Sequence, residues 1–159
     1  MASGAAYAEA LRILARRELP AAGVRTRLLD RGFLPDEIDS TIARLTENGA
    51  IDDRRVARAY ARTAVSVKGR GRTRVGRELL QMGIDPEVVA EALGEVFGEQ
   101  DERTLVNKAI QKKLRGRAKP SGPAEHARLY QYLMRQGFSH TASLAALRRF
   151  RTGGGADQE

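Results

Sequence analysis

Residues able to carry catalysis are few and scattered in this sequence of 159 residues. Histidine occurs only as His126 and His140, which fall on different expected helices and stand at no metal-ligand spacing from a partner. Cysteine is absent, which excludes disulfides, thiolate metal sites and cysteine nucleophiles. No paired carboxylate or histidine constellation suggests a small hydrolase or nuclease. We therefore expect no enzyme activity, no metal and no cofactor, and we interpret both histidines as surface or packing residues.

Two further features resemble parts of catalytic motifs but have structural explanations. Asp36, Glu37 and Asp39 come at an expected helix start, where the helix dipole and capping account for carboxylates. The GRG run at residues 69–71 resembles a fragment of a phosphate-binding loop. It follows a helix rather than a strand and lacks the full glycine pattern. Binding to a partner, rather than catalysis, is the predicted activity.

The balance of charge favours an acidic partner. The 28 Lys and Arg residues outnumber the 20 Asp and Glu residues, leaving a net charge of +8 that attracts nucleic acid, anionic membrane or acidic protein surfaces. Residues 54–77 hold nine cations and no acid, whereas residues 85–102 hold seven acids and no cation. The alternative is that these two segments pair inside the protein. Arginine predominates, and its planar fork suits phosphate or carboxylate recognition.

Apolar spacing predicts an all-α fold. Apolar residues recur at intervals of three and four, and alternating strand patterns are absent. Helices are expected over residues 5–17, 52–67 and 99–115, each with a basic stripe away from its apolar face. No apolar stretch approaches the roughly 18 residues of a membrane span, and the first residues lack a signal-peptide pattern. We expect a cytoplasmic protein without membrane contact.

An internal repeat organises the chain around Gly32, Gly83 and Gly137, which are about 50 residues apart. Apolar residues recur eight residues before each glycine and ten and thirteen residues after it. They are Val24, Val75 and Leu129; Ile42, Leu93 and Leu147; and Leu45, Val96 and Phe150.

Each repeated glycine is expected to end a helix in the left-handed conformation, with the apolar residue after it folding back onto that helix. New helices then begin at residues 35–37, at residues 85–87 and at Ser139, with Asp85 and Ser139 as N-caps. One further helix precedes each pair. The prediction is three tandem three-helix repeats, at residues 5–48, 49–98 and 99–151, in an elongated, curved array, followed by a disordered tail at 152–159.

The predicted contact surface centres on the glycine-rich connector at residues 68–72. Arg74 and Arg128 both stand nine residues before a repeat glycine, which predicts that they are presented alike. The candidate partner-binding or DNA-binding residues are Lys68, Arg70, Arg72, Arg74 and Arg77, supported by Arg25, Arg27 and Arg31 and by Arg128 and Arg135.

The order and spacing of several runs resemble the RecX family of bacterial regulators of the RecA recombinase. The runs are ALRILARRE (10–18), LLDRGF (28–33), GAIDDRRVARAY (49–60), GRGRTRVGREL (69–79), GID (83–85) and YLMRQGFS (132–139). The resemblance covers about residues 5–150, and its middle part is the most specific.

The sequence departs from the family pattern at three places. Pro20 and Gly23 replace the Ser and Glu of a capping box at the second helix, so that helix start loses its reciprocal cap. Arg72 stands where the family commonly has Pro. Ser143 stands where an aliphatic residue is expected, which bears on the packing of the last helix.

The resemblance implies a protein that lodges in the groove of the RecA filament, bridges neighbouring protomers and inhibits ATP hydrolysis and strand exchange. It also implies contact with single-stranded or double-stranded DNA, and we expect a monomer. The alternative is a direct DNA-binding regulator of the helix-turn-helix type. Against it, no single helix carries the cluster of base-reading residues expected of a recognition helix.

Overall fold

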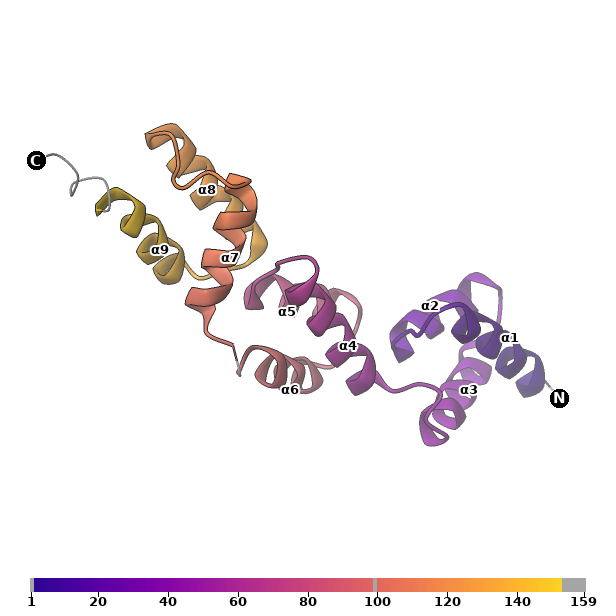
Figure 1. Cartoon of the computed structure of the whole chain (residues 1–159). Coiled ribbons are helices and arrows are strands. Elements are labelled where there is room, and N and C mark those ends of the chain that lie inside the picture. Colours follow the sequence, from indigo (N-terminus) through magenta and orange to yellow (C-terminus); the bar gives the residue numbers. More distant parts are fainter. Residues whose placement is uncertain (1, 99, 153–159) are drawn as a thin grey trace, which may run out of the picture. The chain divides into compact units, whose positions relative to one another are not determined.

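The computed structural model describes residues 2–98 and 100–152, and every regular element within these ranges is an α-helix. In chain order (Figure 1) the helices are α1 (Ala2–Arg16), α2 (Ala21–Asp30), α3 (Pro35–Glu47), α4 (Asp53–Ser66), α5 (Arg72–Gln81), α6 (Pro86–Phe97), α7 (Glu102–Leu114), α8 (Pro123–Gln136) and α9 (His140–Thr152). The predicted all-α fold is confirmed. Thr152 is the last residue of α9, which corrects the predicted start of the tail; residues 153–159 lie outside the described residues.

The three repeat glycines close their helices as predicted. Gly32, Gly83 and Gly137 have φ angles of 85°, 80° and 92°, in the left-handed region. After each one, the next backbone N–H donates to the carbonyl of the leucine four residues before the glycine. These N···O distances are 3.2 Å for Phe33 to Leu28, 3.3 Å for Ile84 to Leu79 and 3.2 Å for Phe138 to Leu133.

Contacts within the chain gather into two compact units. The first contains residues up to Tyr60 together with Glu78–Ala92, and the second contains Ala61–Arg77 together with the residues from Leu93 onward. The boundary therefore passes through α4, α5 and α6, the helices of the middle repeat.

The first unit is built around the mutual packing of α1, α2 and α3 (Figure 1). Its buried cluster consists of aliphatic side chains only, as the low aromatic content of the sequence implies. Val24, Leu28, Ile38 and Leu45 are fully buried in it, and Phe33 packs partly against it. Burial of each such leucine or isoleucine contributes roughly 1.5–3 kcal/mol.

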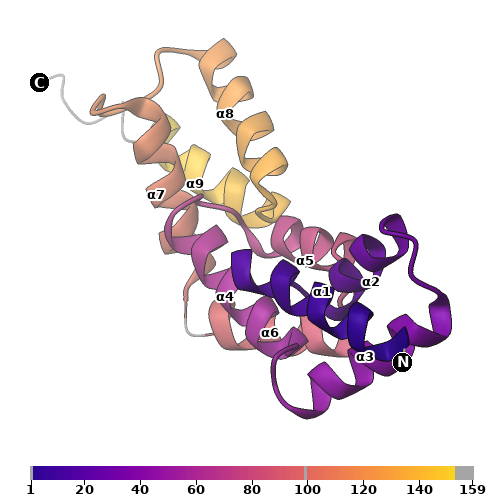
Figure 2. The ribbon, with the colours of Figure 1, turned by 90° about the vertical axis from the view of Figure 1, so that its right-hand side faces the viewer.

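The second unit is built in the same way from α7, α8 and α9, which Figure 2 shows grouped together. Leu133 occupies the position of Leu28, four residues before the glycine, and both are 0% exposed. Phe138, after the glycine, is buried in the same cluster as Val106 and Ile110 of α7. The repeated sequence positions are thus repeated core positions.

Capping side chains fix several helix starts. Asp85 Oδ1 accepts from the Glu87 N–H at 2.9 Å, and Ser139 Oγ accepts from the Ala142 N–H at 3.2 Å. Both predicted N-caps are therefore confirmed. Glu37 likewise accepts from the Leu34 N–H at 3.2 Å, which gives this carboxylate the structural role expected of it.

The start of α2 has no cap of its own but borrows one from α4. Pro20 occupies the N-cap position and offers no side-chain acceptor, as its departure from the family pattern predicted. The Ala21 N–H instead donates to Asp53 Oδ1 at 2.8 Å. This bond joins residues far apart in the sequence and was not predicted.

Replacement of Asp53 with alanine should lower the free energy of unfolding by about 1 kcal/mol, because the Ala21 N–H and the start of α4 both lose a carboxylate. Urea denaturation followed by circular dichroism measures this change. Asp53→Asn keeps an acceptor oxygen and should lose less. Asp30→Ala, at an exposed position near the end of α2, is the matched control and should be close to neutral. Equal effects at Asp53 and Asp30 would contradict the capping role.

The last helix packs around a buried serine. Ser143 is 0% exposed, and its Oγ finds no hydrogen-bond partner among the described residues. In the other two repeats the position six residues after the glycine holds the buried aliphatic residues Ile38 and Val89. The departure from the family pattern at Ser143 therefore places a polar side chain in the core and not on the surface.

Ser143→Ala should stabilise the protein by about 1 kcal/mol, because it removes a buried hydroxyl that has lost its hydrogen bonds to water. A thermal melt should show an increase of about 2–4 °C in Tm. Ser139→Ala removes the N-cap of the same helix and should shift Tm in the opposite direction. A lower Tm for Ser143→Ala would mean that this hydroxyl is hydrogen-bonded in solution.

Candidate partner-binding surfaces

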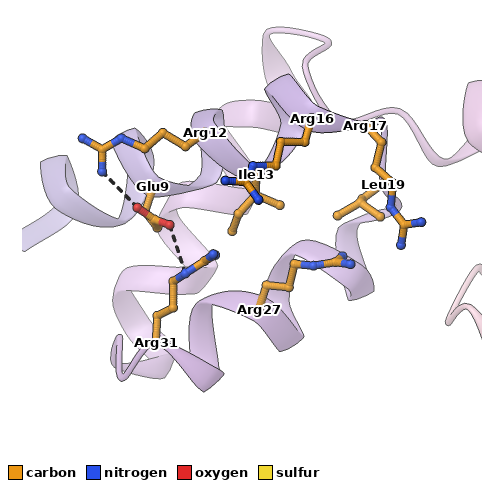
Figure 3. A pocket seen from close by; sticks show the side chains of 8 residues that line it. All are labelled: Glu9, Arg12, Ile13, Arg16, Arg17, Leu19, Arg27 and Arg31. Atoms are coloured by element: carbon orange, nitrogen blue, oxygen red, sulfur yellow. Dashed lines mark hydrogen bonds and ion pairs between the residues drawn. The ribbon is translucent and has the colours of Figure 1, made fainter.

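A groove between α1 and α2 gathers the arginines of the first unit (Figure 3). Its volume is about 310 Å³, and its apolar lining is Ile13 and Leu19. Five cations and one carboxylate line the rest. We call the site the arginine groove; these residues are Arg12, Arg16, Arg17, Arg27, Arg31 and Glu9.

Glu9 already occupies one end of the arginine groove. Arg12 Nη1 donates to Glu9 Oε2 at 3.0 Å, and Arg31 Nε lies 3.0 Å from Glu9 Oε1 (Figure 3). The geometry shows that a guanidinium group from α1 and one from the C-cap of α2 converge on a single carboxylate here. The groove therefore suits oxyanions, for which Arg is the favoured ligand.

The other end of the arginine groove carries three guanidinium groups that have no carboxylate partner among the described residues: those of Arg16, Arg17 and Arg27. Figure 3 shows Arg16 reaching from α1, and Arg27 from α2, into the space between the two helices. Arg27 and Arg31 were predicted as contact residues, whereas the three arginines of residues 12–17 were not. The signal was the four-residue spacing of Arg12 and Arg16, seen only as a stripe on one helix.

The connector before α5 forms a second basic site, with a volume of about 300 Å³, in the second unit. Its backbone is held by an Arg70 N–H bond to the Ala64 carbonyl at 2.9 Å and a Gly71 N–H bond to the Gln136 carbonyl at 2.6 Å. The predicted residues Lys68 and Arg70 line it. We call it the loop hollow; its other polar or aromatic lining residues are Ser66, Gln100, Lys108, Lys112, Tyr132 and Phe138.

A third basic site runs along α8, with a volume of about 510 Å³. The predicted residues Arg128 and Arg135 line it together with residues that were not predicted as contacts. We call it the α8 hollow; these additional residues include Lys113, Arg117, Glu125, Gln131 and Tyr132.

The one carboxylate of the α8 hollow is fully engaged. Arg117 donates to both oxygens of Glu125, and the Ser121 N–H and hydroxyl each donate to Oε2 at 2.6 Å. The Arg117 hydrogen bonds, followed by those of Ser121, lower the pKa of Glu125 to about 2. The Arg117–Glu125 pair is therefore ionised but close to neutral overall, which leaves Lys113, Arg128 and Arg135 as the net charge of the site.

Arg25 and Arg74 are among the predicted contact residues that other parts of the protein hold. Arg25 Nη1 donates to Asp39 Oδ1 at 2.6 Å. Arg74 Nη1 donates to the Arg135 carbonyl at 3.3 Å and to Gln136 Oε1 at 3.0 Å. The two bonds of Arg74 tie the start of α5 to the end of α8.

The prediction that Arg74 and Arg128 are presented alike is wrong. Arg128 is exposed, whereas Arg74 is half-buried against the turn at Gly137. The equivalent positions differ because the start of α5 packs onto that turn, a contact between different repeats. Arg72 and Arg77 are exposed on α5 and line none of the three sites.

The alternative of internal charge pairing is observed at Arg54 of the basic segment. Arg54 Nε donates to Glu91 Oε2 of α6 at 2.9 Å, and this bond raises the pKa of Arg54. Arg55, by contrast, pairs with Glu18 and Asp52, which lie outside the acidic segment.

The described residues contain no group of His, Asp and Glu side chains arranged to hold a metal ion. His140 Nδ1 lies 2.6 Å from the Tyr130 hydroxyl, and His126 Nδ1 lies 3.4 Å from the Gly122 carbonyl.

No helix in the described part of the chain is both long and apolar enough to cross a membrane. These features define an all-α protein of helical repeats with basic surfaces.

Comparison with known proteins identifies the family. Family models described as the first, second and third three-helix domains of RecX match residues 6–45, 52–93 and 100–147. The chain belongs to the RecX family. It is 31% identical to the regulatory protein RecX of Halorhodospira halophila over 138 residues, covering 87% of this chain and 83% of that protein. It is 33% identical to the RecX of Chromohalobacter salexigens, covering 82% of each.

Solved structures share the fold. The crystal structure of RecX from Lactobacillus salivarius matches with a TM-score of 0.72 and 21% sequence identity. The match covers 95% of this chain and 97% of that one. The predicted tandem arrangement of three-helix repeats is therefore confirmed.

Proposed function

We propose that this protein regulates a RecA-type recombinase by lodging in the helical groove of the recombinase filament and inhibiting ATP hydrolysis and strand exchange. The observation that carries the proposal is the ordered match of three RecX domains along the chain. Relatives matched over more than four fifths of their length are named regulatory protein RecX. The proposed setting is DNA recombination and repair in the cytoplasm, including the SOS response.

The charged surfaces support action by binding. Each of the two units has its own basic site, so the chain can hold a polymeric partner at more than one place. Contacts that bridge neighbouring protomers would restrain the movements that accompany ATP hydrolysis. In this proposal the protein acts as a monomer and needs no cofactor, and its repeats are residues 5–48, 49–98 and 99–151.

The arginine groove is the proposed protein-contact site of the first unit. Glu9 shows which chemistry it accepts, and acidic side chains of the recombinase would occupy the end at Arg16, Arg17 and Arg27. Hydrogen bonds to charged groups contribute about 1.5–3 kcal/mol each. Loss of all three arginines is therefore expected to weaken binding at least tenfold.

The test measures recombinase ATPase on single-stranded DNA against increasing concentrations of this protein. Arg16, Arg17 and Arg27 are replaced together with alanine, and Arg74 is left intact because it holds the α5 start. We expect the concentration for half-inhibition to rise by about tenfold or more.

A variant with the same loss of charge outside the three sites is the control, and it should inhibit as the wild type does. Its changes are at exposed positions: Arg62→Ala, Arg103→Ala and Lys119→Ala. Unchanged inhibition by the groove variant would remove the arginine groove from the mechanism. Failure of the wild-type protein to inhibit would overturn the proposed function itself.

A further inference from the structure

Between α8 and α9 lies a hollow that differs in character from the three basic sites. Its volume is about 620 Å³, and it belongs entirely to the second unit. A single guanidinium group and no carboxylate line it, and most of the remaining lining is apolar. We call it the α9 hollow; its main lining residues are Pro123, Ala127, Tyr130, Leu144, Leu147 and Arg148.

The apolar character of the α9 hollow comes from two positions of the repeat. Seven residues before and seven residues after the repeat glycine, the third repeat has Tyr130 and Leu144, whereas the first has Arg25 and Asp39. In the first repeat these side chains form an ion pair between α2 and α3, with 2.6 Å between Arg25 Nη1 and Asp39 Oδ1. In the third repeat both positions line the hollow. The same face of the helix pair is thus ionic in one repeat and apolar in the other.

The second repeat fills the equivalent face by close packing. Gly76 stands at the position of Tyr130, and Leu93 stands at the position of Leu147. A Cβ atom added at Gly76 would lie only 3.1 Å from Leu93 Cδ1, so the missing side chain lets α5 and α6 approach each other. The third repeat has neither the ion pair nor the glycine, and a hollow remains beside Leu147.

The α9 hollow leaves apolar surface in contact with water. Tyr130 and Leu144 are only partly buried, and Pro123 and Ala127 are exposed. Apolar patches rimmed by polar residues mark protein interaction sites, because covering them removes apolar area from water. A hollow between two helices suits the side chains of a third helix laid across them, which is the geometry of helix-in-groove recognition.

The charge around the α9 hollow selects an acidic occupant. Arg148 lines the hollow and is exposed. Glu125, on the same helix as Tyr130, is held by Arg117 and does not line the hollow. A second copy of this chain is a poor occupant, because each chain carries a net charge of +8 and two copies repel each other.

We propose that the α9 hollow binds an amphipathic helix of an acidic partner protein. An apolar side chain of that helix lies between Tyr130 and Leu144, and an acidic side chain lies beside Arg148. The inference goes beyond the proposed function, because this contact involves neither a recombinase filament nor DNA. It also differs from the arginine groove, where carboxylates alone are recognised.

Three short fluorescein-labelled peptides test the chemistry of the site by fluorescence anisotropy with the full-length protein alone. In the first peptide, Leu and Glu are patterned as an amphipathic helix. The second has Ser in place of each Leu and keeps the charge, and the third has Lys in place of each Glu. We expect the Leu–Glu peptide to bind at least about tenfold more tightly than the Ser–Glu peptide, because it buries apolar side chains. The Leu–Lys peptide should bind more weakly because the protein repels it.

An exchange between repeats locates the binding. Tyr130→Arg together with Leu144→Asp installs the residues of the first-repeat ion pair and leaves the net charge unchanged. Binding of the Leu–Glu peptide should weaken by about tenfold or more, to the level of the Ser–Glu peptide. Binding at the arginine groove would not respond to this exchange. Leu34→Ala is the control, because Leu34 is 64% exposed and does not line the α9 hollow, and it should bind as the wild type does.

Reversal of charge gives a second variant that does not alter the apolar lining. Arg148→Glu, at an exposed position, should weaken binding of the Leu–Glu peptide by about two- to tenfold and strengthen binding of the Leu–Lys peptide. Thermal melts verify that each variant is folded, and this variant tests the proposal even if the exchange of Tyr130 and Leu144 impairs folding.

Several outcomes would overturn the inference. Equal binding of the Leu–Glu and Ser–Glu peptides would exclude an apolar anchor, and unchanged binding in either folded variant would place the peptide elsewhere. Dimerisation in sedimentation velocity that the exchange abolishes would make a second copy the occupant. Because no recombinase is present, a negative result leaves the proposed function standing. Conversely, an absence of ATPase inhibition leaves this inference standing.

Discussion

Truncation of Leu133 to alanine is expected to lower the free energy of unfolding by about 2–5 kcal/mol. Leu133 is 0% exposed in the core of the second unit, and its carbonyl accepts the hydrogen bond that closes the turn at Gly137. Loss of the side chain opens a cavity against the surrounding α7 and α9 residues. Domains of this size are stable by only about 5–15 kcal/mol, so the variant should be close to unfolding at moderate temperature.

Hydrogen exchange can locate this effect. Each unit has its own buried cluster, so amides of α7–α9 should lose protection in Leu133→Ala while those of α1–α3 retain most of theirs. Leu28→Ala is the matched variant, because Leu28 holds the same repeat position in the first unit and is also 0% exposed. It should give the reverse pattern. Uniform loss of protection in both variants would contradict the division into two units.

Replacement of Gly71 with alanine is expected to cost about 1–3 kcal/mol and to move the loop hollow. A Cβ atom at Gly71 would lie 2.6 Å from the carbonyl carbon and oxygen of Gly137 and 2.8 Å from the Phe138 nitrogen. All three are backbone atoms, so no side-chain rotation relieves the overlap. The Gly71 N–H bond to the Gln136 carbonyl must lengthen, and Lys68 and Arg70 then move away from α7.

Gly94→Ala is the control for this variant. Gly94 lies inside α6, and a Cβ atom added there would meet nothing within 4 Å, so alanine should be neutral or should stabilise by about 0.5–1 kcal/mol. Chemical denaturation measures both changes. A Gly71→Ala protein as stable as the wild type would show that the contact with the Gly137 turn is not maintained in solution.

The candidate sites were only partly predictable. The glycine-rich basic connector predicts Lys68 and Arg70 as contact residues. Lys108 and Lys112, which complete the loop hollow, were seen only as a stripe on their own helix. Nothing in local sequence tells which helix faces the connector, because that depends on the docking of Gly71 against the turn at Gly137.

Long-range polar contacts could not be predicted from the sequence either, because they also depend on how the helices pack. The cap of α2 is Asp53, from α4, and the carboxylate that joins Arg12 to Arg31 is Glu9, which approaches Arg31 only when α1 and α2 pack. Arg74 has the same repeat position as Arg128 but a different environment, because a different element packs against it. Each case depends on a neighbour that the spacing of one helix cannot reveal.

The sequence by itself determined the helices, their glycine turns and the core positions. These features follow from short-range physics: a side chain reaches the next turn of its helix, an N-cap reaches the first backbone amides, and only glycine readily takes the left-handed conformation at a helix end. The tertiary structure alone decided which cations converge and which are held by internal acids. Those outcomes arise when faces from distant parts of the chain meet, and the charge on one face does not specify its partner.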